Sequence, residues 1–152
     1  MTDTVKTKTA TADLLQSVYK NVKMASDSIL NVMPKIKNEK LKHEMTVQLS
    51  TFDAFASRTA KLLAKEGVKP TEEGTVTKLT SKWGTMVNTM IDSTASHIAE
   101  MMIEGATMGV NDMIKQLREA ENGTASEDSL QLARDVCAFE ERIVEEMKAY
   151  LR

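Results

Sequence analysis

Apolar residues recur every three or four positions in four segments of the chain, and this spacing predicts amphipathic α-helices. In the first segment, roughly Thr11 to Met33, the apolar positions are Leu14, Leu15, Val18, Val22, Ile29 and Val32. No segment alternates Val, Ile, Thr and Tyr with polar residues in the way of a strand. The sequence therefore predicts an all-α protein built from four helices.

A second helix is expected after Asn38, a good N-cap residue, and its end is expected at Gly67, with Pro70 beyond. The positions that share its inner face are Leu41, Met45, Gln48, Phe52, Phe55, Thr59 and Leu62. Residues 68–82 are numerous enough to run back along the whole second helix, which would give a crossover connection. If residues 72–83 are instead helical, the loop is short and a simple up-down-up-down bundle results.

The third helix is expected in the proline-free run from Trp83 to Glu121, closed by Asn122-Gly123. We take Val87, Thr94, Met101 and Met108 as a seven-residue spine of its inner face. His97 and Glu104 lie beside this spine, on a side of the helix that is also expected to face the core. Both polar side chains are therefore expected to be hydrogen-bonded, paired or metal-bound, because an unsatisfied buried polar group is costly.

The fourth helix is expected to open at Thr124, whose spacing to Glu127 is that of a capping box. Its inner face is Ala133, Val136, Cys137, Glu140, Ile143, Val144, Met147 and Leu151. Glu140 falls near the centre of this face, where an acid is least expected. We predict that Glu140 is enclosed.

Composition and charge narrow the class of protein further. Residues 1–10 are polar and expected to be frayed, and residues 11–152 are expected to form one domain. The first half of the chain is basic and the second acidic, and its basic residues are scattered, which argues against nucleic acid as a partner. A single cysteine, Cys137, and the lack of a secretory or membrane-spanning apolar run favour a cytoplasmic protein that is not in a membrane.

The inward polar residues allow two interpretations. The favoured one is a buried hydrogen-bonded network of Glu140, Gln48 and His97 that fixes the register of the helices, without a cofactor. The alternative is a site for iron, manganese or zinc with His97, Glu104 and Glu140 as ligands. Gln48 would then form a hydrogen bond to one of these ligands without binding the metal itself. No Glu-x-x-His, the motif of di-metal bundles, occurs in the chain.

Methionines are frequent, and most are expected to fill gaps in a core that is poor in aromatic residues. Met102, Gly105 and Gly109 extend the apolar surface of the third helix, and glycines permit close approach of another helix. We therefore expect a homodimer or a higher homo-oligomer.

Two stretches also carry a family resemblance: residues 88–109, Asn-Thr-Met-Ile-Asp-Ser-Thr-Ala-Ser-His-Ile-Ala-Glu-Met-Met-Ile-Glu-Gly-Ala-Thr-Met-Gly, and Cys137-Ala-Phe-Glu-Glu141. They resemble a group of small uncharacterised bacterial proteins of the ferritin-like superfamily, over about Leu14 to Leu151. The resemblance implies a four-helix bundle with a crossover between the second and third helices. Active relatives use di-iron or di-manganese centres, whereas relatives without metal have structural or stress-associated roles, some of them in spores.

From the residues and the resemblance together, we expect a non-catalytic structural, stress-associated or spore-associated bundle with a degenerate metal site. A non-haem metal-binding protein or oxidoreductase that uses His97, Glu104 and Glu140 is the first alternative. A helical adaptor that binds a protein partner along its methionine-rich face is the second.

Overall fold

The computed structural model describes residues 3–71 and 83–152, and within these ranges it is helical, with no strand. The long helices are α1 (Asp3–Val32), α2 (Glu39–Lys65), α4 (Ala95–Glu121) and α5 (Glu127–Met147). Two short 3-10 helices, η1 (Met33–Lys35) and η2 (Lys148–Tyr150), follow α1 and α5. Residues 83–88 are also helical. The predicted all-α class is confirmed, while the predicted connection at 72–82 lies outside the described residues.

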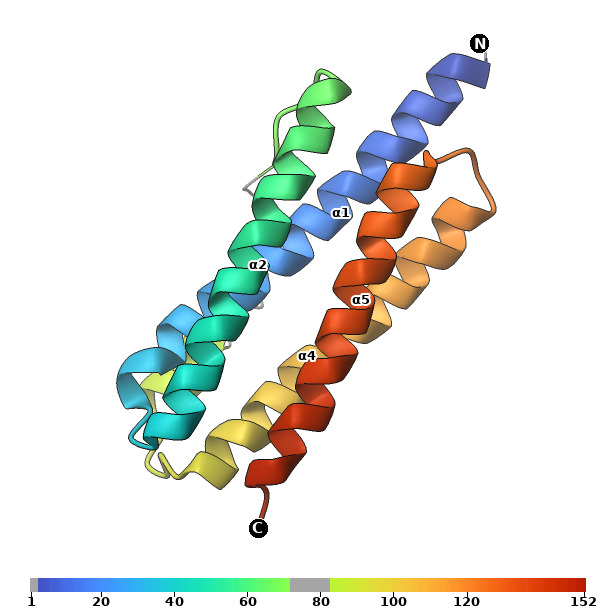
Figure 1. Ribbon diagram of the computed structural model, residues 1–152. Helices are drawn as coiled ribbons and strands as arrows, with labels where there is room; N and C mark the ends of the chain where they lie inside the picture. The colour runs from blue at the N-terminus through green and yellow to red at the C-terminus, as the bar shows by residue number, and fades with distance from the viewer. Residues whose placement is uncertain (1–2, 72–82) are drawn as a thin grey trace.

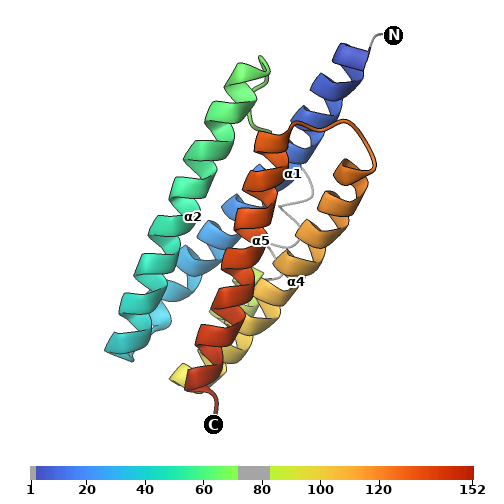
Figure 2. The same cartoon turned by 45° about the vertical axis from the view of Figure 1, so that its right-hand side comes forward.

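The four long helices form a bundle in which α1 lies beside α2 and α4 lies beside α5 (Figure 1). The turned view in Figure 2 shows the same two pairs. Hydrogen bonds from Ser17 to Gln116 and from Asn21 to Gly109 show that α1 and α4 run in opposite directions. Since α2 also runs opposite to α1, α2 and α4 point the same way (Figure 1).

The first helix begins earlier than predicted. It starts at Asp3 instead of Thr11, so the residues expected to be frayed are helical from position 3 onward. Residues 3–10 contain neither glycine nor proline, and threonine costs a helix only a few tenths of a kcal/mol per residue. The apolar pattern marks where a helix is packed, and the helix itself continues beyond it.

The ends of α2 agree with the prediction. The side chain of Asn38 accepts a hydrogen bond of 2.9 Å from the backbone N–H of Leu41, and Gly67 follows the helix with a φ of 71°. Only glycine adopts such a backbone angle without strain. Beyond it, Gln16 of α1 binds the chain through the carbonyl of Lys69 and the N–H of Thr71. The chain leaving α2 is therefore attached to α1.

The third predicted helix is interrupted. Residues 83–88 are helical, residues 90–94 are not, and α4 begins at Ala95 with Thr94 as its N-cap, which accepts from the N–H of His97. The side chain of Asp92 in turn accepts from the N–H of Thr94. Short polar side chains that bond to the nearby backbone favour such a helix start over a continuous helix. The prediction of one helix from Trp83 to Glu121 is wrong.

The start of α5 also differs in detail from the capping box predicted at Thr124. Ser126 is the N-cap and accepts a hydrogen bond of 3.3 Å from the N–H of Ser129. The N–H of Ser126 donates to the hydroxyl of Thr11, at 2.9 Å. This contact connects the loop between α4 and α5 to the first half of α1. The sequence pattern of α5 alone cannot predict a contact with another helix.

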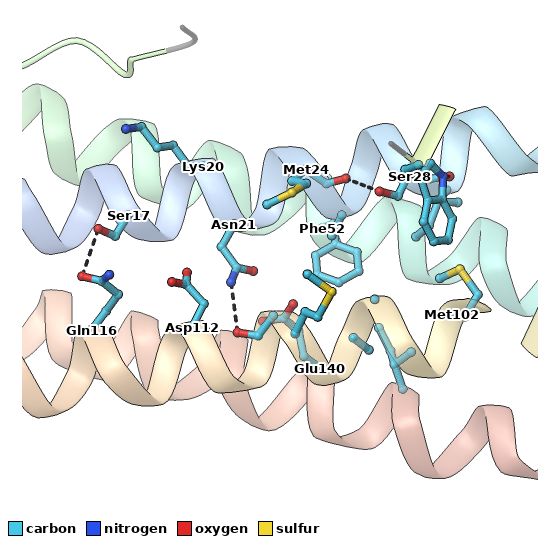
Figure 3. A pocket seen from close by; sticks show the side chains of 18 residues that line it. Ser17, Lys20, Asn21, Met24, Ser28, Phe52, Met102, Asp112, Gln116 and Glu140 are labelled. Atoms are coloured by element: carbon cyan, nitrogen blue, oxygen red, sulfur yellow. Dashed lines mark hydrogen bonds between the residues drawn. The ribbon is translucent and has the colours of Figure 1, made fainter. Parts of the chain in front are cut away.

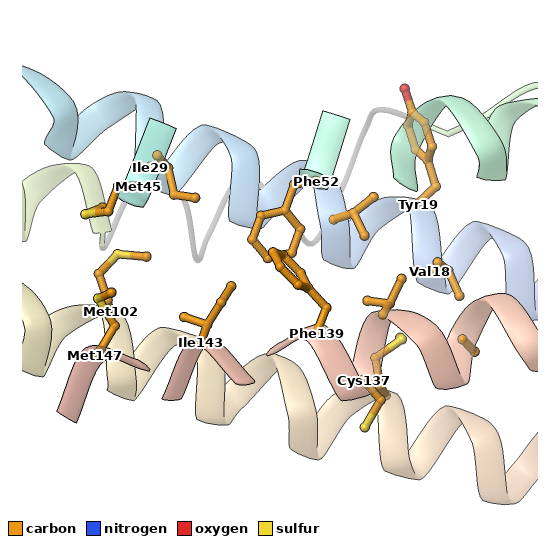
Figure 4. Close-up of a cluster of buried hydrophobic side chains, with 14 of the residues drawn as sticks. Val18, Tyr19, Ile29, Met45, Phe52, Met102, Cys137, Phe139, Ile143 and Met147 are labelled. Atoms are coloured by element: carbon orange, nitrogen blue, oxygen red, sulfur yellow. The ribbon is translucent and has the colours of Figure 1, made fainter. Parts of the chain in front are cut away.

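The core contains apolar residues from all four long helices (Figure 4). Phe139 of α5 lies edge-on against Phe52 of α2, with ring centroids 5.0 Å apart, and 5.8 Å from Phe55. These three phenylalanines are the only ones in the chain, and they fill the space between α2 and α5. Among the described residues, no helix has the length and apolar character needed to cross a membrane.

Candidate binding site around Glu140

Glu140 is buried in the middle of α5, with 2% of its surface exposed. The prediction that it is enclosed is confirmed. Gln48 and Thr59 of α2 are buried as well, as predicted. The hydroxyl of Thr59 donates to the carbonyl of Phe55, whereas neither side-chain polar atom of Gln48 has a hydrogen-bond partner among the described residues.

His97 and Glu104 do not lean inward as predicted. The side chain of His97 is 37% exposed, with Nδ1 3.9 Å from the carboxylate of Glu100, and Glu104 is exposed. The predicted spine assumes a continuous helix from Val87 onward. The break at 90–94 interrupts this helix, so the residues after it do not keep the rotational positions that the spine predicts. The buried face of α4 is formed by Ile98, Ala99, Met101, Met102, Met113 and Leu117.

The structure does not bring His97, Glu104 and Glu140 together as a set of metal ligands. In the described ranges, no group of three or more His, Cys, Asp or Glu side chains is placed where it could hold a metal ion. Gln48 forms no hydrogen bond with any of the three, so the predicted network of Glu140, Gln48 and His97 is not assembled either. Glu140 needs another explanation.

The carboxyl group of Glu140 lies directly against Gly109 of α4. A Cβ atom added at Gly109 would overlap with Oε2 of Glu140 and would lie 2.9 Å from its Cδ and 3.3 Å from its Oε1. Real Cβ atoms do not approach other atoms that closely. Glycine at position 109 therefore makes room for the buried carboxyl group.

Asn21 of α1 reaches the same place from the opposite side. Its Nδ2 donates a hydrogen bond of 3.1 Å to the carbonyl oxygen of Gly109. Because a carbonyl only accepts, this bond fixes which end of the amide is nitrogen. The oxygen, Oδ1, is buried and has no hydrogen-bond partner in the described part of the chain. Oε1 of Glu140 is in the same situation.

A pocket of about 510 Å³ opens beside these groups (Figure 3). Its walls come mainly from α1 and α4, with Phe52 from α2 and Glu140 and Ile143 from α5. Trp83 closes part of it and is attached to α1 by a hydrogen bond of 2.9 Å from its Nε1 to the carbonyl of Ser28. Met102, Gly105 and Gly109, predicted as an outer docking face, line this pocket. Its volume is within the range of small-molecule sites.

Three ionisable residues line the pocket, the acids Glu140 and Asp112 and the base Lys20. Burial, and to a smaller extent the nearby carboxylate of Asp112, raise the pKa of Glu140 to about 8. Asp112 is exposed and also lines the pocket. Lys20 is a basic lining residue, and Figure 3 shows its side chain directed away from Asp112. The site therefore disfavours further negative charge.

Cys137, one turn before Glu140, is not reactive in this setting. Its Sγ donates to the carboxylate of Glu141 at 3.5 Å, and it is 7% exposed. Burial and the Glu141 carboxylate raise the pKa of the thiol to about 11, so the thiolate needed for nucleophilic chemistry is scarce at neutral pH.

Two residues of the site, Asn21 and Gly109, are not among the predicted polar groups. The pattern of the first segment gives only apolar inner positions, whereas Asn21 and Ser26 of α1 are also buried, at 5% and 2% exposed. Asn21 follows Val18 by three positions, which places both on one face of a helix. That spacing was a usable signal, whereas the contact between Gly109 and Glu140 depends on how two helices meet.

The fold and site define an all-α bundle with one buried acid beside a largely apolar pocket. Comparison of the chain with protein-family models, with curated proteins and with solved structures finds no match.

Proposed function

We propose that this protein is a cytoplasmic, ferritin-like four-helix bundle with a structural or stress-associated role, as in spores, and without catalytic activity. The shared direction of α2 and α4 supports the proposal, because a bundle of this kind needs a crossover between its second and third long helices (Figure 1). Self-association is part of the proposal. It is supported by exposed apolar side chains, of which Ile91 (99% exposed) and Met108 (49%) are examples.

The observation that carries the proposal is the isolation of Glu140. It is the only buried Asp, Glu, His, Lys or Arg in the described part of the chain. A ferritin-like di-metal centre needs carboxylates from four helices and histidines from two of them, all projecting inward. Of the best alternatives for such ligands, Glu104 is exposed and the side chain of His97 is 37% exposed.

Metal content tests this proposal. Protein purified without chelator and scanned by X-ray fluorescence at the metal edges should carry no stoichiometric iron, manganese or zinc. If one of these metals is stoichiometric and is lost in Glu140→Ala but kept in Glu104→Ala, the protein is a metal-binding protein and the non-catalytic role is contradicted. Light scattering on the same sample should give a mass above that of the 16.9 kDa monomer.

A further inference from the structure

Two of the residues that line the pocket each carry a buried oxygen atom that lacks a hydrogen-bond donor. They are Oδ1 of Asn21 and Oε1 of Glu140, and neither has a partner among the described residues. Both side chains lie at Gly109: Asn21 donates a hydrogen bond to its carbonyl oxygen, and the carboxyl group of Glu140 occupies the space that a Cβ at this position would need. An unsatisfied buried oxygen costs stability, so a bound donor would stabilise this arrangement.

The charges select the kind of donor. Glu140 and Asp112 bring two carboxyl groups to the pocket, and the side chain of Lys20 is directed elsewhere (Figure 3). A cationic donor interacts favourably with Asp112 and with the ionised form of Glu140, and its hydrogen bonds to a carboxylate are stronger than those between neutral groups. An ammonium group also offers several N–H donors, which is enough to serve both oxygens.

The rest of the pocket selects the body of the ligand. Beside the polar end, the lining is apolar and includes Met24, Phe52, Met102 and Ile143. Trp83, which also lines the pocket, provides an aromatic wall held by its bond to Ser28. Methionine side chains adapt to ligands of different shape, and burial of an apolar body against them is favourable.

We infer that the pocket between α1 and α4 binds a small amphipathic amine, with its ammonium group at Asn21 and Glu140 and its apolar part between Met24, Phe52, Met102 and Trp83. This inference goes beyond the proposed structural role. Its test does not depend on the metal content that decides that role.

The test uses the full-length protein and the fluorescence of Trp83, the single tryptophan of the chain and a wall of the pocket. Phenylbutylammonium is titrated as the probe, and phenylbutanol and phenylbutanoate serve as the matched neutral and anionic compounds. We expect saturable binding of the ammonium compound, at least about tenfold tighter than the alcohol, since hydrogen bonds to a charged group differ from neutral ones by that order. The carboxylate compound should bind most weakly.

Two variants locate the ammonium group. Glu140→Gln keeps the shape of the side chain but cannot ionise beside a bound ammonium group, so the preference for the ammonium compound over the alcohol should disappear. Glu104→Gln makes the same change at an exposed position of α4 and should retain the preference. Persistence of the preference in Glu140→Gln would overturn the assignment.

If a variant folds poorly, measurements on the wild-type protein alone still test whether the pocket binds the amine. Equal affinity for the ammonium compound and the alcohol, or no fluorescence response to either, would overturn the inference without any substitution. Tighter binding of the carboxylate compound would overturn it as well.

Discussion

The interface between α2 and α5 is filled by aromatic rings, whereas the interface between α1 and α4 encloses a pocket of about 510 Å³. On the first side, the ring of Phe139 packs against both Phe52 and Phe55. On the second side, Asn21 and Glu140 are buried with oxygen atoms that lack partners in the described residues.

The difference indicates how the bundle combines stability with a binding site. Close packing supplies most of the stability of a small domain, and partnerless buried polar groups reduce it. Natural proteins tolerate such costs mainly where a site requires them, and well-packed parts of the fold offset them. We therefore expect the two interfaces to respond differently to substitution.

The largest effect is expected from Phe139→Ala on the packed side. Removal of a ring that contacts Phe52 and Phe55 should lower the free energy of unfolding by about 3 to 5 kcal/mol. Met24→Ala, on the pocket side, should cost less than about 1.5 kcal/mol, since this partly buried side chain already lacks neighbours on one side. Urea unfolding measures both, and equal losses would contradict the distinction between the two interfaces.

The next effect concerns pH. The carboxyl group of Glu140 titrates near 4.5 in an unfolded chain and at about 8 in the folded protein, because burial disfavours its charged form. From pH 4.5 to 8 the unfolded state therefore releases a proton that the folded state keeps. Over this range the free energy of unfolding of the wild type should fall relative to that of Glu140→Gln, by on the order of 3 kcal/mol.

Denaturant unfolding at several pH values measures this difference. Below pH 4.5 the stabilising contribution of the protonated carboxyl group is fully present, and above pH 8 it is lost. Glu104→Gln is the control, because its carboxyl group is exposed. Parallel stability curves for the wild type and Glu140→Gln would show that Glu140 is not held in its neutral form.

A smaller effect is expected from the two glycines that line the pocket. Gly109→Ala places a Cβ against the carboxyl group of Glu140, so the side chain or the helix must move. Gly105→Ala meets only a ring carbon of Trp83 at 3.7 Å, an ordinary contact, and gains the better helix propensity of alanine. Thermal unfolding should find Gly109→Ala less stable than Gly105→Ala by about 1 to 3 kcal/mol. A reversed order would contradict the contact of Gly109 with Glu140.

The smallest effect is expected at the outer edge of the packed side. Arg58 of α2 and Asp135 of α5 form an ion pair of 2.8 Å, with side chains 45% and 37% exposed. Such exposed pairs contribute less than about 1 kcal/mol, so Arg58→Ala should change the free energy of unfolding by no more than that. The difference should shrink further in high salt. A loss comparable to that of Phe139→Ala would show that the ion pair, and not the rings, holds α2 to α5.

The sequence predicts the helix class and the burial of Glu140 because α5 is an uninterrupted helix. Its inner residues follow one rotation from Ala133 to Met147, and the helix wheel places most of them correctly, although it omits the buried Phe139 and includes Leu151, which is 41% exposed. The same arithmetic fails for His97 and Glu104, because it was carried through the break at residues 90–94. Asp92 and Thr94, which cap the new helix, were the signal that should have restarted the count.

The pocket could not be predicted from the pattern of apolar and polar residues. Helix wheels state which residues face inward, but they do not state at what height or distance two helices meet. The contact of Gly109 with Glu140 and the bond from Asn21 to the carbonyl of Gly109 depend on the relative positions of α1, α4 and α5. Only coordinates supply that information.

The account depends most on the state of Glu140, and an NMR titration of its side-chain carboxyl carbon tests that state directly. The signal is assigned by its loss in Glu140→Gln. We predict a titration midpoint near pH 8, the value expected for the buried carboxyl group beside Asp112 and the pocket. In the ligand-free protein, a midpoint near 4.5 would mean that the group is hydrated or paired with a basic side chain, and it would contradict the buried, partnerless acid on which the site rests.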